Sequence, residues 1–222
     1  MSYVLNSNSQ TAAATSISVT YTVPAGGRWL DVVVTTGGNY TAITGVTDGT
    51  NTFVLDTAAY DATDGQSLSR WKSPSLIPAG SYTLTASFAS IPYIGIAVAA
   101  VPNSTGQIAS LSGNYQAAPG TGTGGVTTGS SGTLSSAPAL LLSWVLGPSG
   151  TISLTSAGGS TVDSGGSMWT NIKANFLQLE TQVLNATTSV AGTWTSANGN
   201  PTISVGGVWQ QPNNSATVAW LT

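Results

Sequence analysis

The chain has 222 residues, of which only 5% are charged, against about 25% in an ordinary soluble domain. Four Lys and Arg residues and seven Asp and Glu residues give a formal net charge of −3, which excludes the clustered basic surface that nucleic-acid binding requires. The sequence has no Cys and no His, so disulfides, thiol nucleophiles, zinc–thiolate sites and Ser-His-Asp triads are excluded as well.

The N-terminal residues lack the positive charge and the apolar stretch of a secretory signal peptide. No window reaches the roughly 18 apolar residues of a membrane span. We therefore expect an untargeted chain that has no membrane partner.

Strand patterns dominate the first half. In residues 17–23, Ile17, Val19, Tyr21 and Val23 share one face and hydroxyl side chains share the other, which is the period of a half-buried strand. Residues 29–35 form a nearly continuous apolar run that is typical of a central strand. By the same test, residues 51–56, 82–88 and 94–101 are strands, separated by turns rich in Gly, Pro, Asn and Asp.

The second half repeats the strand pattern of the first. Residues 29–34, 82–88 and 98–101 correspond in order, and at a nearly constant offset, to residues 139–144, 188–194 and 205–208. A Gly-, Thr- and Ser-rich connection at residues 113–132 lies between the halves. The sequence therefore predicts an all-β sandwich fold of two units, 1–112 and 113–222. Whether these units are separate or merged stays open, as does the choice between helix and bulged strand for residues 171–184.

Carboxylates are the first candidates for a functional site. Asp56, Asp61 and Asp64 lie close together before a glycine, as in a calcium loop, but their spacing differs from that of an EF-hand and no bidentate Glu follows. We interpret them as a solvated turn. Glu180 and Asp163 lie in no recognisable motif for the carboxylate pair of a glycosidase. We therefore predict no metal, no cofactor and no catalytic carboxylate.

A nucleophilic serine would need Lys72 or Lys173 as its base, because the chain has no His. Ser69 and Lys72 match the S-x-x-K pattern, but the S-D-N and K-T-G elements that accompany it in serine enzymes are missing. We interpret the match as part of an exposed strand or loop. The sequence predicts that the protein is not an enzyme.

Seven tryptophans are the second set of candidates. Those in strand-like runs are predicted to be core residues: Trp29, Trp144 and Trp194. Those beside polar residues are predicted to be partly exposed: Trp71, Trp169 and Trp209. Exposed tryptophans suit either a protein interface or a platform for sugar rings, and we expect the interface role.

Two segments resemble a known class of domain. Residues 46–53, which begin Val-Thr-Asp, and residues 78–88, which contain Gly-Ser-Tyr-Thr-Leu-Thr, are similar to the low-charge immunoglobulin-like or jelly-roll-like β-sandwich domains of tailed-bacteriophage virion proteins. The resemblance implies a structural virion protein, either a capsid decoration or a tail-associated subunit. Its partners would be copies of itself and other virion proteins. The alternative is an extracellular carbohydrate-binding module, which a groove lined by exposed Trp and Tyr would favour.

Overall fold

The first half of the chain forms two antiparallel sheets in the computed structural model. The structure describes residues 3–102, 104–116, 124–148, 152–153, 161–162, 175–196 and 202–212. The larger sheet has the order β1 (Val4–Gln10), β8 (Ile94–Val101), β3 (Trp29–Thr36), β6 (Gln66–Lys72) and β5 (Val54–Asp61). The smaller sheet has the order β2 (Ala14–Val23), β7 (Gly80–Ile91) and β4 (Ile43–Thr47), with a 3-10 turn, η1 (Tyr40–Ala42), before β4.

The second half also forms a larger and a smaller antiparallel sheet. The larger sheet has the order β13 (Thr161–Val162), β14 (Asn175–Leu184), β11 (Ala139–Pro148), β16 (Thr202–Gln210) and β9 (Gly106–Gln116). The smaller sheet has the order β10 (Gly124–Thr127), β15 (Thr193–Ser196) and β12 (Ile152–Ser153). The segment left open between helix and strand therefore contains strand β14, and its residues 171–174 lie outside the described residues.

The two halves have the same topology. Adding eight to each strand number of the first half reproduces both sheet orders of the second half: β1-β8-β3-β6-β5 becomes β9-β16-β11-β14-β13, and β2-β7-β4 becomes β10-β15-β12. The repeat seen in the sequence is thus present in the strand order, with β3 and β11 at the two centres. The order β1-β8-β3-β6 facing β2-β7-β4 is that of an eight-stranded jelly roll, except that β5 extends the larger sheet.

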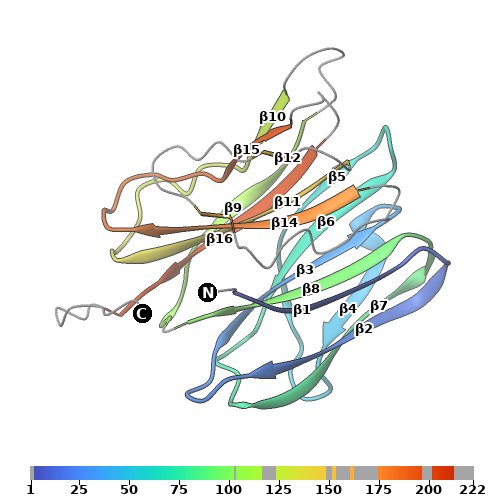
Figure 1. Cartoon of the computed structure of the whole chain (residues 1–222), viewed down its shortest axis with the longest axis horizontal. Helices are drawn as coiled ribbons and strands as arrows, with labels where there is room; N and C mark the ends of the chain where they lie inside the picture. The colour runs from blue at the N-terminus through green and yellow to red at the C-terminus, as the bar shows by residue number, and fades with distance from the viewer. Residues whose placement is uncertain are drawn as a thin grey trace.

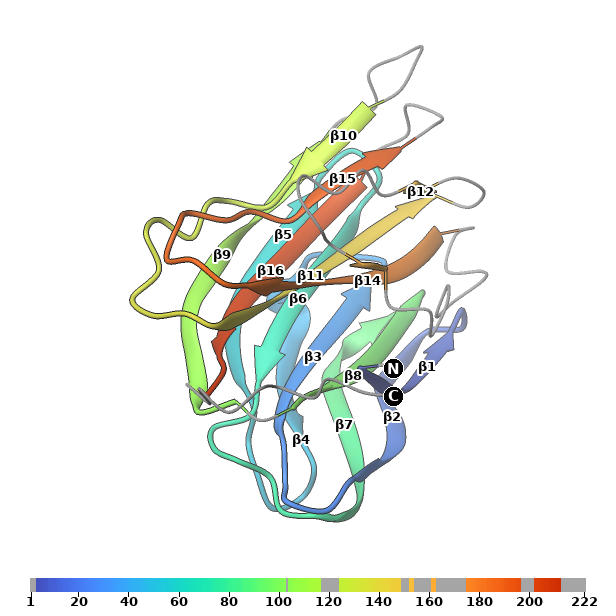
Figure 2. The ribbon, with the colours of Figure 1, turned by 60° about the vertical axis from the view of Figure 1, so that its left-hand side comes forward.

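Four sheets stack as layers, with the two larger sheets in the middle (Figures 1 and 2). One apolar core fills the first sandwich, and a second core lies between the two larger sheets, where Val33, Leu68 and Ala97 of one half meet Leu142 and Val205 of the other. The central strands are consequently buried on both faces. This burial explains why β8 is a continuous apolar run and β3 a nearly continuous one, whereas β2 alternates between buried and exposed residues.

The two predicted units are therefore merged through a shared core. Strand β9 crosses the predicted boundary at residue 112 and pairs with β16, so the change from the first pair of sheets to the second lies between β8 and β9. The Gly-rich connection is partly strand, because β9 ends at Gln116 and β10 begins at Gly124; residues 117–123 lie outside the described residues. The described segments contain no helix with the length and hydropathy of a bilayer-crossing segment.

Candidate functional site

A cluster of charged side chains lies between the two larger sheets. Asp31 on β3 and Arg70 on β6 are both fully buried. The Arg70 Nε donates to both carboxylate oxygens of Asp31, at 3.1 and 2.9 Å, and Nη2 donates to Oδ2 at 2.5 Å. The Arg70 Nη1 donates to Asp56 on the edge strand β5. One guanidinium therefore holds two carboxylates, which is the pairing that a buried charge requires.

The second half of the chain completes the coordination of Asp31. The indole Nε1 of Trp144 donates to Asp31 Oδ1 at 3.0 Å, and the indole Nε1 of Trp209 donates to Oδ2 at 3.1 Å. The Trp209 ring also lies against Arg70, with the guanidinium carbon 5.6 Å from the ring centroid, which is a cation–π distance. Gly207 leaves space for this guanidinium, because a Cβ at Gly207 would lie 2.4 Å from Arg70 Cζ. This cluster therefore fixes the second half on the first.

Asp56 is the outer member of the charge cluster, with a side chain that is 3% exposed. Besides Arg70, it accepts hydrogen bonds from Gln107 Nε2 at 3.0 and 3.1 Å and from Ser110 Oγ at 2.6 Å, and Lys72 Nζ lies 3.1 Å away. Burial raises the pKa of Asp56, but the charge of Arg70 and the hydrogen bonds from Ser110, Lys72 and Gln107 together lower it below its ordinary value.

This lowered pKa predicts a specific acid sensitivity. Because the pKa of Asp56 is lower in the folded than in the unfolded chain, its stabilisation is present above the unfolded value of about 3.9 and is lost as the pH falls through the folded value. We expect the free energy of unfolding, measured with urea, to fall as the pH is lowered from 5 to 2. Asp56→Asn should be less stable at neutral pH and should lose less stability on acidification. If the wild type and Asp56→Asn lose the same free energy of unfolding on acidification, this assignment is contradicted.

Asp56→Asn should still lose some stability on acidification, because the pKa of Asp48 is also lowered in the folded protein. Burial raises this pKa, but hydrogen bonds from Asn51 and from the Thr50 backbone outweigh the effect of burial. Comparison of the two proteins therefore isolates the contribution of Asp56.

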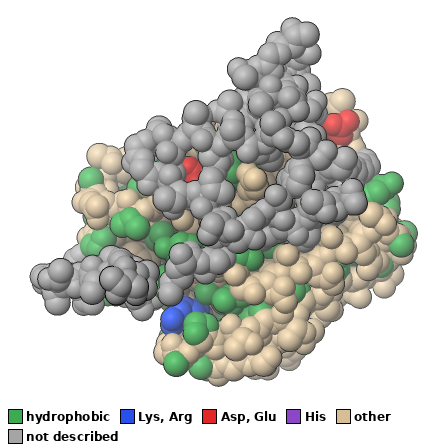
Figure 3. All heavy atoms as spheres, viewed as in Figure 1, with side chains coloured by type: hydrophobic (Ala, Val, Ile, Leu, Met, Phe, Trp, Pro, Cys, Tyr) green, Lys and Arg blue, Asp and Glu red, His purple; other side chains and the backbone are tan. Residues whose placement is uncertain are grey.

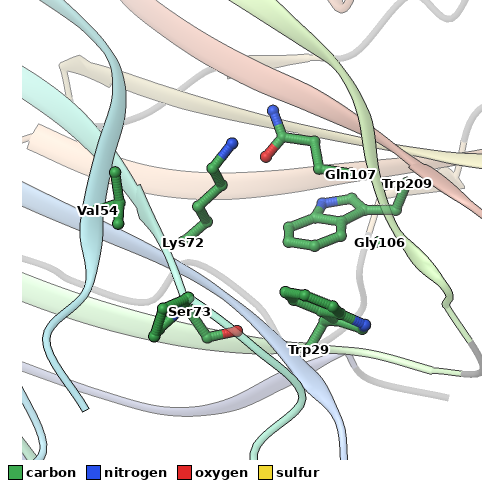
Figure 4. Close-up of a pocket in the computed structure, with 8 residues that line it drawn as sticks. Trp29, Val54, Lys72, Ser73, Gly106, Gln107 and Trp209 are labelled. Atoms are coloured by element: carbon green, nitrogen blue, oxygen red, sulfur yellow. The ribbon is translucent and has the colours of Figure 1, made fainter.

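A pocket of about 370 Å³ opens beside the charge cluster (Figure 4). It is lined by residues of both halves: Trp29, Val54, Lys72, Ser73, Pro74, Gly106, Gln107 and Trp209. The rings of Trp29 and Trp209 lie with centroids 5.9 Å apart and planes inclined at 46°. Trp29 is partly exposed, whereas Trp209 is fully buried and backs the pocket. We name this feature the Trp29 pocket.

The predicted exposure of the tryptophans needs correction at three positions. Trp71 is only 8% exposed and packs in the core of the first sandwich, and Trp209 is fully buried. Trp29, predicted to be a core residue, is partly exposed. Trp144 and Trp194 are buried as predicted. Trp169 lies outside the described residues.

The acidic residues also differ from the solvated turn that the sequence suggested. Asp56 belongs to the charge cluster, and Asp61 is 2% exposed and accepts from the backbone of Thr63 and Asp64 at 2.8 and 3.3 Å. Only Asp64 is exposed. Glu180 is buried on β14 rather than on the surface, and Asp163 lies outside the described residues.

The structure separates the S-x-x-K pair instead of joining it. Ser69 and Lys72 are an odd number of residues apart on β6, so they face opposite sides of the sheet. Ser69 is fully buried, not exposed as expected, and its hydroxyl donates to the Val34 carbonyl at 3.1 Å and accepts from Trp71 Nε1 at 2.9 Å. Lys72 is instead paired with Asp56. Lys173 lies outside the described residues.

Comparisons with known proteins give little further information. No family model and no curated protein matches the chain. Among solved structures, the major capsid protein P2 from bacteriophage PM2 aligns over 97% of this chain and 99% of its own, at 9% identity and a TM-score of 0.28. This similarity is too low to support an argument, so the description of the fold depends on the strand order.

Proposed function

We propose that this protein is a structural virion subunit that assembles in many copies. The observation that carries the proposal is the tandem repeat of one jelly-roll-like strand order, joined through a shared core. Jelly rolls recur in viral capsid and lectin domains. A chain that merges two of them provides a four-layer block, and the outer face of its first smaller sheet can contact other copies.

The outer face of the smaller sheet of the first half suits such contacts. It carries short hydroxyl side chains that bond to each other across strands: Ser18 Oγ lies 2.8 Å from Thr85 Oγ1, and Thr20 Oγ1 lies 3.3 Å from Thr83 Oγ1. In Figure 3, charged side chains are sparse among the coloured atoms of the visible face. Short uncharged side chains lose little conformational entropy on contact and do not repel an identical copy.

Strand β2, an edge of this smaller sheet, is protected by side chains of β1. The Asn6 and Asn8 amides donate to the carbonyl oxygens of Thr20 and Ser18, each at 2.7 Å. An edge strand with bonded carbonyls is a poor template for strand addition. We infer that copies join through faces rather than by adding strands at β2.

Within the particle, we infer a place in or on the capsid shell, because jelly rolls recur in capsid domains. The sequence predicts two specific roles, capsid decoration and tail association. Separating capsids from tails and measuring which fraction carries the chain distinguishes them.

We expect self-association that resists salt. Few charges are available for ion pairs, and about 1 M salt screens those that are exposed, so the mass distribution at a given protein concentration should barely change between low and high salt. Thr83→Lys should weaken association by adding a charge to the hydroxyl face, whereas Thr63→Lys, in an exposed turn, should not. Sedimentation over a concentration series measures both effects. A strict monomer, or assemblies that dissociate at moderate salt, would contradict the proposal.

A further inference from the structure

We propose that the Trp29 pocket binds a neutral sugar unit of a glycan. Its accessible rim is amphipathic: Trp29 and Pro74 are exposed at least in part, Val54 is 48% exposed, and the Lys72 side chain is 32% exposed. A pyranose ring presents an apolar C–H face that can stack on an aromatic ring, together with hydroxyl groups that donate and accept hydrogen bonds. This rim offers partners for both.

The Gln107 amide supplies an unused acceptor to this pocket. Its Nε2 donates to both oxygens of Asp56 and to the Ala109 carbonyl at 3.1 Å. Carboxylate and carbonyl oxygens only accept hydrogen bonds, so the amide cannot be turned the other way. Its Oε1 is buried and has no hydrogen-bond partner within the described part of the chain. In Figure 4 this oxygen is directed toward the space beside Lys72 and Trp209.

A small movement of the pocket wall would let a ligand hydroxyl reach that buried oxygen and donate to it. A buried acceptor without a partner is unfavourable, so a ligand that donates to Gln107 Oε1 binds more tightly than one that only fills the space. Lys72 Nζ has three protons and lies 3.1 Å from Asp56 Oδ1, so it can also donate to a ligand oxygen. Sugar hydroxyls provide both a donor and an acceptor within one ring.

The charges beside the pocket cancel, which favours a neutral ligand. Arg70 and Lys72 are matched by Asp31 and Asp56, which lie in contact with them, so the cluster beside the pocket has no net charge to attract an anion. The volume of about 370 Å³ lies near the lower end of the range of roughly 300–1,000 Å³ for ligand pockets. A terminal sugar of a neutral glycan therefore fits better than an acidic sugar or a long polymer.

The test is a titration of the dilute, unassembled protein with maltotriose, cellotriose, chitotriose and mannotriose, with sialyllactose as the anionic comparison. Tryptophan fluorescence should change saturably with at least one neutral trisaccharide and not with sialyllactose. Val54→Arg should block the pocket and weaken that binding about tenfold or more, equivalent to about 1.4 kcal/mol. Val183→Arg is the matched control, because Val183 is 49% exposed and does not line the pocket.

Thermal unfolding of each variant shows whether it is folded, and Trp29→Ala provides a second loss-of-binding variant. The proposal is wrong if no neutral trisaccharide binds, if sialyllactose binds best, or if Val54→Arg and Val183→Arg bind equally. It is also wrong if sugars do not bind and only Val54→Arg abolishes self-association, because the pocket is then a contact between copies. The binding is measured on unassembled protein, so its failure is distinct from failure of the structural role.

Discussion

Asp31→Ala should lower the free energy of unfolding by at least about 4 kcal/mol, since breaking a buried ion pair costs about 3–5 kcal/mol and each orphaned donor adds to that loss. The substitution removes one of the two carboxylates that accept from Arg70, and it removes the acceptor of the indole N–H groups of Trp144 and Trp209. Urea unfolding at neutral pH measures the loss.

Asp31→Asn is the control that separates charge from shape. The amide fills the same volume but has one acceptor oxygen, and its NH₂ group would face donors. We expect a loss smaller than that of Asp31→Ala but still above about 1 kcal/mol. If Asp31→Ala is as stable as the wild type, the charge cluster does not hold the halves together.

Arg70→Met should produce the second large loss, about 3–5 kcal/mol, because it leaves two buried carboxylates without their shared cation. The matched control is Lys72→Met, which removes the other cation beside Asp56. The Lys72 side chain is 32% exposed and the Arg70 side chain is fully buried, so the control should cost about 1 kcal/mol or less. Equal losses in urea unfolding would show that burial does not determine the strength of these pairs.

Much of the fold could be predicted because each strand is marked by the spacing of apolar and polar residues along the sequence. The alternation over residues 17–23 corresponds to the buried and exposed faces of β2. The apolar run over residues 29–35 corresponds to β3, which has strands on both sides and sheets on both faces. The ordered repeat corresponds to β3 and β11 and to β8 and β16, whereas only residues 193–194 of the predicted match to β7 lie in β15. The period of a strand and the order of a repeat are properties of the sequence itself, so they can be read without tertiary contacts.

The tryptophan errors have a common physical cause. Trp71 and Trp209 were predicted to be exposed because Lys72 and Gln210 are their neighbours. In a strand, however, adjacent side chains point to opposite faces, so a polar neighbour does not indicate that a residue is exposed. Trp71 faces the first core, while Lys72 faces the other side.

Only one member of the charge cluster, Asp31, could be recognised from the sequence, and its partners could not. Asp31 interrupts an apolar run, and a carboxylate in a strand buried on both faces needs a partner. The identity of the partners is not local, because Trp144 and Trp209 are 113 and 178 residues away in the chain. Only the packing of the second half on the first brings them to Asp31.

The structural role is tested most directly by counting this chain in purified virus particles. Quantitative mass spectrometry of gradient-purified particles, taken from a lysate that contains the protein, measures its abundance relative to the other particle proteins. Our proposal predicts a multi-copy component that stays with the particle through high-salt washing. Absence from the particles, with the chain recovered as free monomer in the same lysate, would contradict it.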